Sequence, residues 1–314
     1  MTERQKGIIA LGVVLVAWSF SSPVVKYLMP YYDPWTQNLY RYGAGMLVML
    51  PFLARRLPRS ERGEPGRLNR RTLLRLLGPA LPNIVQQTAW VVALVWIYPA
   101  LAAFLNKSSV LFAAAMAYFL FPEERWLFRS KRFLGGLALS VAGTLGLALW
   151  RPDLDKMQIN LGVGLVLVAA AAWAVYTVAA KRPTQEVGAP VAFAVVSIYT
   201  TLAFVPMALA WGDVGHFCVV PWRVNVIMIV SGIFCIGLAH TLYFYAIQRL
   251  GASVCATMML TTPLGTLVLS RWMFGERLTG GQSLGGVLLL AGGALTLLAK
   301  EKPVPAELTQ AVEV

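Results

Sequence analysis

One lysine stands deep inside an apolar stretch of this 314-residue sequence, where few groups could do chemistry. Lys107 lies about 8 residues into a run that starts near position 99, which is roughly 12 Å along a helix and near the centre of a ~30 Å bilayer core. Its charge is costly against lipid. We therefore expect Lys107 either to face a wet cavity, where its ammonium attracts a substrate carboxylate, or to bond backbone carbonyls, Asn106 or Ser108.

Two polar residues occupy matching places in two other apolar runs. Gln87 and His240 are each followed by a threonine and, three residues on, by an aromatic residue, Trp90 and Tyr243. Matched polar positions predict a site between them, in which His240 hydrogen-bonds a substrate or titrates near neutral pH. A satisfied contact between two helices is the alternative. Asn83 extends the polar face around Gln87.

Aromatic residues fall well inside the apolar runs, away from the membrane interfaces where tryptophan and tyrosine usually collect. A cavity walled by such rings favours flat or apolar solutes through burial and stacking. Ordinary packing or lipid-facing positions remain the alternative for each of them. The ones that we expect to line a substrate site are Trp18, Trp90, Trp173, Tyr176 and Tyr243.

The acidic residues and the known catalytic motifs exclude several classes of protein. All 14 acidic residues lie outside the apolar runs or at their edges, which argues against tightly proton-coupled extrusion of cations and favours uniport, exchange or weak coupling. The sequence has no HExxH, GxGD or Walker motif, and its three cysteines show no CxxC spacing. We expect no catalytic residue, no metal site and no cofactor.

The composition predicts an all-α integral membrane protein. Hydrophobic residues make up 58% of the chain and charged residues 13%, against roughly 25% charged in soluble proteins. The net charge of +13 arises between apolar runs, so we do not expect nucleic-acid binding. Ten runs are long enough to be transmembrane helices. They are 7–29, 35–54, 73–97, 99–120, 132–150, 159–180, 189–211, 224–248, 252–273 and 280–299.

The distribution of basic residues predicts the orientation in the membrane. Lysine and arginine number 18 on the side of the termini and 5 on the opposite side, which places both termini in the cytoplasm. The loop 57–71 is expected to touch anionic lipid. We interpret Lys26 and Lys181 as anchors at helix ends. Arg41 is expected to snorkel to the interface or to pair with Asp33.

An internal repeat organises these runs. Gly7, Trp18 and Lys26 align with Gly162, Trp173 and Lys181 at an offset of 155 residues, although similar apolar helices could also align by chance. The offset is 153 for His240 and Gln87. We predict two five-helix halves, 1–155 and 156–300, followed by a cytoplasmic tail, 301–314. Since five is odd, the halves are inverted and enclose a central cavity, the usual arrangement of alternating-access carriers.

Short motifs recur in the same order in both halves. FPE at 121–123 and FGE at 274–276 follow the fourth and ninth runs, and LGG-x6-G opens the fifth and tenth. In this pattern the chain resembles the drug/metabolite transporter superfamily, EamA type, and within it the YddG-like exporters of aromatic amino acids. The resemblance implies a basket of helices around the cavity, with the fifth and tenth helices outside it.

The expected function is that of a secondary transporter in a bacterial inner membrane, exporting amino acids, especially aromatic ones, by alternating access. A multidrug or organic-cation exporter, or another small-metabolite exchanger of the same superfamily, is the alternative, and an intramembrane enzyme is a remote one. Small-xxx-small spacing at Gly281 and Gly285, and at Gly136 and Ser140, indicates close helix packing within a monomer, with a dimer face as the alternative.

Overall fold

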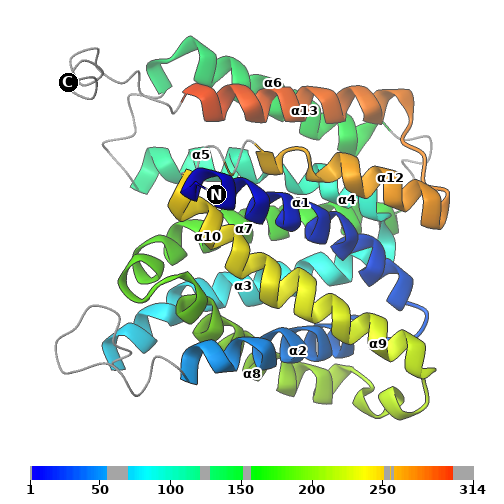
Figure 1. Ribbon diagram of the computed structural model, residues 1–314. Coiled ribbons are helices and arrows are strands. Elements are labelled where there is room, and N and C mark those ends of the chain that lie inside the picture. Colours follow the sequence, from blue (N-terminus) through cyan, green and yellow to red (C-terminus); the bar gives the residue numbers. More distant parts are fainter. Residues whose placement is uncertain are drawn as a thin grey trace.

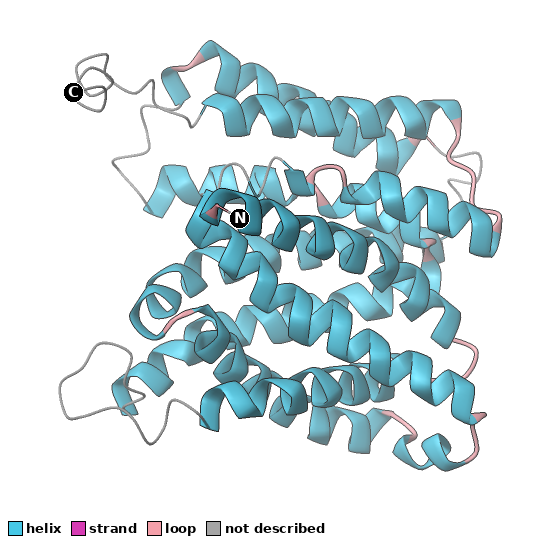
Figure 2. Cartoon of the chain, viewed as in Figure 1, coloured by secondary structure: helices cyan, strands magenta, loops and turns pink. Residues whose placement is uncertain are grey.

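The apolar runs fold into helices throughout the part of the chain that the structure describes. This computed structural model describes residues 2–54, 70–120, 128–150, 157–250, 255 and 258–299, and these contain no strand. Figures 1 and 2 show the helices lying side by side in one bundle. The FPE motif, most of the loop 57–71, the junction at 155 and the tail 301–314 lie outside the described residues.

The helix bounds follow the predicted runs, with interruptions in three of them. The fourth run is divided into α4 and α5, and the eighth run contains a π-helical segment, η3, between α9 and α10. In the ninth run a turn at 260–261 precedes α12. The helices are α1 (Glu3–Leu28), α2 (Pro34–Ala54), α3 (Arg70–Trp96), α4 (Pro99–Asn106), α5 (Ser109–Leu120), α6 (Lys131–Leu149), α7 (Met157–Val187), α8 (Ala189–Trp211), η2 (Val214–Cys218), α9 (Trp222–Ser231), η3 (Gly232–Leu238), α10 (Ala239–Leu250), α12 (Thr262–Phe274) and α13 (Gly280–Ala299).

Seven described segments are long and apolar enough to cross a membrane. They include α1, α6, α8 and α13, most of α7, and two composite segments that run through α4–α5 and α9–η3–α10. The helices α2, α3 and α12, which cover the other predicted runs, do not meet this criterion over the described residues. A multi-pass membrane protein is therefore supported, and the number of ten spans stays a prediction.

The contacts between helices are reciprocal between the two halves. Helix α1 packs on α10 and α12, and its counterpart α7 packs on α3 and on α4–α5. Equivalent glycines lie at equivalent contacts, because a Cβ at Gly7 would meet Leu250 at 2.9 Å and one at Gly162 would meet Ile97 at 2.8 Å. Two further pairs, α2 with α8 and α6 with α13, join a helix of one half to its own counterpart. This pattern fits the predicted repeat.

Helices α6 and α13 form a pair at the edge of the bundle (Figure 1). They are antiparallel, since Gly136 faces Gly292 while Gly143 faces Gly285 further along. The backbones approach so closely that a Cβ at Gly143 would lie 2.4 Å from the Leu289 nitrogen. The small-xxx-small spacing of Gly136 and Ser140 thus serves packing inside the monomer.

Two charged side chains hold the corner between α3 and α4. Lys26 Nζ donates to the Leu94 carbonyl at 2.7 Å and to the Val95 carbonyl at 3.3 Å, at the end of α3. Glu276, from the FGE motif, accepts the backbone N–H groups of Ala100 at 2.9 Å and Leu101 at 3.0 Å, at the start of α4. Each charge matches the partial charge at its helix end. Lys26, which we interpreted as an anchor at a helix end, bonds the carbonyls left unpaired where α3 ends.

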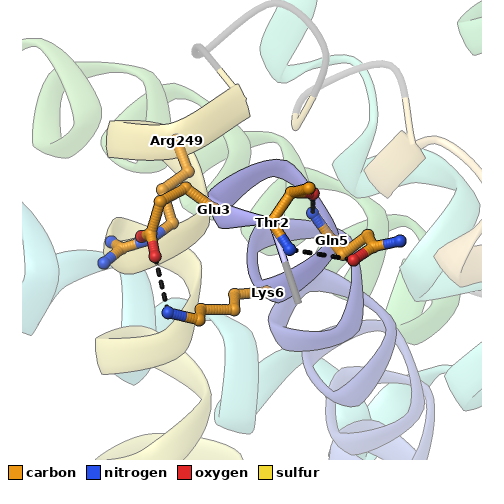
Figure 3. A network of polar contacts seen from close by, with 5 residues as sticks. All are labelled: Thr2, Glu3, Gln5, Lys6 and Arg249. Atoms are coloured by element: carbon orange, nitrogen blue, oxygen red, sulfur yellow. Dashed lines mark hydrogen bonds and ion pairs between the residues drawn. The ribbon is translucent and has the colours of Figure 1, made fainter.

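A smaller polar network ties the start of α1 to the end of α10. Thr2 and Gln5 form a capping box, in which the Gln5 N–H donates to Thr2 Oγ1 at 3.2 Å and the Thr2 N–H donates to Gln5 Oε1 at 2.9 Å. Beside it, Glu3 contacts Lys6 at 2.6 Å and Arg249 at 2.8 Å, as Figure 3 shows. These exposed contacts connect the ends of two helices that both line the cavity, and each contributes little to stability.

We expect Gly143→Ala to destabilise the protein, because the new Cβ would press on the backbone of α13. Overpacking of this kind typically costs about 1–3 kcal/mol. The matched control is Gly135→Ala on the same helix, where a Cβ meets nothing within 4 Å. Thermal unfolding of the purified protein in detergent measures both. Equal melting temperatures for the two variants would contradict the close approach of α6 and α13.

Glu276→Gln should also lower the melting temperature, since a neutral amide offers one acceptor oxygen where the carboxylate offers two. Glu276 is only 7% exposed, and it also accepts a hydrogen bond from Ser270. Losing hydrogen bonds to a buried charge costs about 1–3 kcal/mol. Glu186→Gln is the control, because that carboxylate is 41% exposed in its ion pair with Arg75 and contributes little. If Glu186→Gln lowered the melting temperature as much as Glu276→Gln, this would contradict the role of Glu276 in binding the first amides of α4.

Candidate functional site

A cavity of about 130 Å³ lies between the two halves, at the centre of the bundle. One ordered water needs roughly 10–15 Å³ by this measure, so the cavity can hold a small organic solute. Helices α1, α3, α4 and α5 line it from the first half, and α7, η3, α10 and α12 from the second. The lining residues are Trp18, Ser21, Ser22, Gln86, Gln87, Trp90, Ala103, Asn106, Lys107, Ser109, Trp173, Cys235, Ile236, His240, Tyr243, Met259, Thr262 and Thr266.

Aromatic rings from both halves meet in one wall of this cavity. The repeat-related pair Trp18 and Trp173 lie edge to face, with centroids 5.7 Å apart and planes at 87°. Trp18 also contacts Tyr243, at 5.1 Å. Its indole N–H donates to the Cys235 carbonyl at 3.0 Å, which fixes the ring against η3. The wall therefore offers apolar, polarisable faces suited to a flat solute.

Lys107 sits where the fourth run is interrupted. Its backbone N–H bonds the Phe104 carbonyl and that of Ser108 bonds the Leu105 carbonyl, both at 3.0 Å, so one tightened turn joins α4 to α5. The side chain lines the cavity, and no described residue hydrogen-bonds its ammonium. Next to it, Asn106 Oδ1 is buried and has no partner in the segments that the structure describes. The described contacts favour the cavity-facing alternative for Lys107 over the packing one.

The charge of the cavity is positive, because Lys107 lines it and none of the lining residues is an aspartate or glutamate. Low dielectric strengthens the field of an ammonium that has no counter-ion. An anionic group of a solute would supply that counter-ion. The cavity is accordingly suited to solutes that carry a carboxylate or similar group next to an apolar body.

His240 is held between rings at the edge of the same cavity. It stacks on Phe193, with centroids 4.7 Å apart and planes at 6°, and lies edge to face with Trp18 at 5.2 Å. Its Nδ1 contacts the Ile236 carbonyl of η3 at 3.0 Å. The other ring nitrogen, Nε2, is buried and has no partner in the described part of the chain.

Seven of the nine residues expected from the sequence line this cavity: Trp18, Gln87, Trp90, Lys107, Trp173, His240 and Tyr243. The structure does not place Asn83 or Tyr176 there. Asn83 bonds the Tyr42 hydroxyl and, at 2.9 Å, Thr200 Oγ1. Tyr176 is 2% exposed and packs against Leu76 and Val195, with its ring 5.4 Å from that of Trp173.

The expectation for Arg41 was wrong on both alternatives. The side chain is 2% exposed, and it donates to Ser231 Oγ at 3.0 Å and Ser21 Oγ at 3.1 Å. Asp33 instead accepts backbone N–H groups, including that of Asp213 at 3.0 Å. The reason is the close approach of α2 to η3: a Cβ at Gly232 would lie 2.3 Å from the Arg41 carbonyl oxygen, so the side chain is enclosed. Because Ser21 lines the cavity, Arg41 lies directly behind its wall.

Small polar residues of the lining were not expected from the sequence. Ser21 and Ser22 follow Trp18 by one turn, while Thr262 and Thr266 share one face of α12. The spacing of Trp18 and Ser22 was a usable signal, since residues four apart share a helix face. In the described residues, no group of three histidine, cysteine or acidic side chains could hold a metal ion.

Comparisons with known proteins address the family and the fold. A model of the EamA-like transporter family matches residues 5–149 and 160–298, and the two matches begin 155 residues apart. One solved structure, described as the crystal structure of a protein, covers 95% of this chain and 100% of its own, with a TM-score of 0.63 at 16% sequence identity. At that identity the likeness concerns the fold alone. No curated protein matches the sequence.

Asn83→Ala is expected to lower the melting temperature without changing the affinity of the folded protein for its solute. The substitution leaves the buried Tyr42 hydroxyl without its amide partner, which costs about 1–3 kcal/mol. Thermal unfolding and solute affinity in proteoliposomes, normalised to folded protein, measure the two quantities separately. A weaker affinity for the solute at an unchanged melting temperature would contradict this expectation and indicate that Asn83 belongs to the binding site.

Proposed function

The chain belongs to the EamA-like transporter family of the drug/metabolite transporter superfamily, and from this premise we propose that it exports amino acids, aromatic ones in particular. The family match and the apolar helices support a multi-pass membrane transporter, as opposed to an enzyme. The observation that carries the substrate proposal is the central cavity. Among the described residues that line it, the cavity has one ammonium without a counter-ion, no carboxylate and a wall of aromatic rings.

Each part of an aromatic amino acid has a counterpart in this cavity. Lys107 is the partner for the carboxylate, through a charge-assisted hydrogen bond. The amide oxygens of Gln86 and Asn106, which are buried and have no partner among the described residues, are acceptors for the ammonium group. Trp18, Trp173 and Tyr243 are the surface on which the ring lies.

Alternating access is the mechanism that we propose for this site. The cavity lies between the halves, and the contacts of α1 with α10 and α12 mirror those of α7 with α3 and α4–α5. Rocking of one half against the other would open the cavity to either side while keeping the same lining residues. We further propose a bacterial inner membrane, a monomer and cytoplasmic termini, the last because of the excess of basic residues on that side.

The alternative substrates make different demands on the cavity. Organic cations would be favoured by a buried carboxylate, and none of the lining residues is acidic. Phosphorylated metabolites would be favoured by several cations, and Lys107 is the sole lysine or arginine in the lining. These solutes are the natural competitors to include in a transport assay.

Counterflow in proteoliposomes tests the proposal directly. Vesicles loaded with unlabelled tryptophan should accumulate labelled tryptophan faster than empty vesicles, because exchange through a single site needs no added energy source. Tyrosine and phenylalanine should compete with the labelled solute. No accumulation of any amino acid above protein-free vesicles would defeat the substrate proposal.

Lys107→Ala should weaken tryptophan binding by roughly ten- to hundredfold, since a hydrogen bond to a charged group is worth about 1.5–3 kcal/mol. Tryptamine, which lacks the carboxylate, should be affected far less. Competition constants for both ligands in counterflow provide the measurement, and the exposed Lys131→Ala is the matched control. Equal losses of affinity for tryptophan and tryptamine would contradict the proposal that Lys107 binds the carboxylate.

A further inference from the structure

We infer that His240 selects aromatic solutes whose ring carries a hydrogen-bond donor, by accepting that donor at Nε2. Indole and phenol rings carry such a group, and a phenyl ring does not. This inference rests on the proposed function, because it concerns the same cavity and takes an aromatic solute as given. It adds a residue that discriminates between rings, independently of the group that binds the carboxylate.

The neighbours of the imidazole determine its tautomer. The partner of Nδ1 is the Ile236 carbonyl oxygen, at 3.0 Å, and a carbonyl can only accept a hydrogen bond. The proton of a neutral imidazole is therefore on Nδ1, and Nε2 is left as an acceptor. No carboxylate lines the cavity, so nothing in the lining pairs with a second proton on this ring.

The packing of the ring fixes the position of that acceptor. Phe193 stacks on one face of His240, while Trp18 at 5.2 Å and Trp173 at 6.2 Å meet the imidazole edge to face. The side chain is 4% exposed, and its partner Ile236 belongs to the π-helical segment η3. Such segments are rare and recur at functional sites. Three ring contacts and the hydrogen bond to Ile236 hold the imidazole in one orientation at the cavity that it lines, and Nε2 is therefore fixed in place.

An unpartnered buried nitrogen makes the site selective. Burying an acceptor without a donor costs about 1–3 kcal/mol, and a solute that supplies the donor recovers part of this. A phenyl ring fills the same space and leaves Nε2 unpaired. Gln87, the repeat counterpart of His240, cannot impose this choice, because an amide both donates and accepts. The two halves are thus equivalent in position and different in chemistry at this pair.

The test compares ligands that differ only in the ring donor. Tryptophan and its isostere 3-benzothienylalanine, in which sulfur replaces the ring N–H, are measured as competitors of labelled tryptophan in counterflow with the full-length protein. Tyrosine and phenylalanine form the second pair. We expect the donor-bearing member to bind roughly three- to tenfold more tightly in each pair, as one net hydrogen bond provides.

Substitutions then assign the selectivity to one residue. His240→Phe keeps an aromatic ring for stacking and removes the acceptor, so both ratios should fall to about one. The control is His216→Phe, because the other histidine of the chain lies in η2, is 44% exposed and does not line the cavity. This control should keep the ratios of the unsubstituted protein.

Three outcomes would overturn the inference. Equal binding within both pairs by the unsubstituted protein would do so even if His240→Phe failed to fold. Ratios that survive His240→Phe would assign the selectivity to another acceptor, such as Gln86. If no amino acid competes at all, the proposed function fails as well. In the first two outcomes an aromatic amino-acid transporter would remain, without selectivity for the ring donor in the first and with a selectivity that His240 does not provide in the second.

Discussion

Helix ends that lie away from bulk water must find partners for their unpaired backbone groups, and the arrangement of the cavity depends on how the α3–α4 corner meets this demand. Lys26 bonds the carbonyls at the end of α3, and Glu276 bonds the amides at the start of α4. Tyr98 at the N-cap offers no side-chain hydrogen bond there, and Pro99 has no N–H group. With its first turn anchored, the short helix α4 ends at the cavity, where Lys107 follows it. Glu276 at the start of α4 thus helps to set the position of Lys107, which lines the cavity at the other end of the helix.

The two halves place residues at equivalent positions, and the residue types at these positions can differ. Trp18 and Trp173 keep the same residue type and meet each other in the cavity wall. Gln87 and His240 both line the cavity, yet one carries an amide and the other an acceptor nitrogen. Lys107 corresponds to Leu260, so the positive charge lies on one half alone. The helices around the cavity are thus arranged symmetrically, while the charges that line it are distributed asymmetrically. This distribution suits a solute whose two ends differ in charge.

Two cationic side chains in the interior are stabilised by hydrogen bonds to neutral groups. Arg41 is bonded to two serine hydroxyls, and one of these, Ser21, also lines the cavity. Lys26 is bonded to carbonyls. Lys107 is the exception, since no described residue hydrogen-bonds its ammonium. The same interior supplies partners for two other cations, and the absence of a partner for Lys107 among the described residues is what supports the binding role that we propose for it.

Periodicity, composition and the repeat were enough to predict the apolar helices, the two-repeat layout and seven of the residues that line the cavity, because bilayer thickness and the matching of two halves constrain a sequence directly. Trp18, Gln87 and His240 could be found in this way. The positions of Asn83, Tyr176 and Arg41 could not be predicted. Each packs against residues of other helices, and the sequence does not show which helices are neighbours. Whether such a side chain faces the cavity or a packed neighbour depends on the rotation of its helix and on close approaches such as that of Arg41 to Gly232. Only the tertiary structure decides these, because they arise from contacts between segments far apart in the chain.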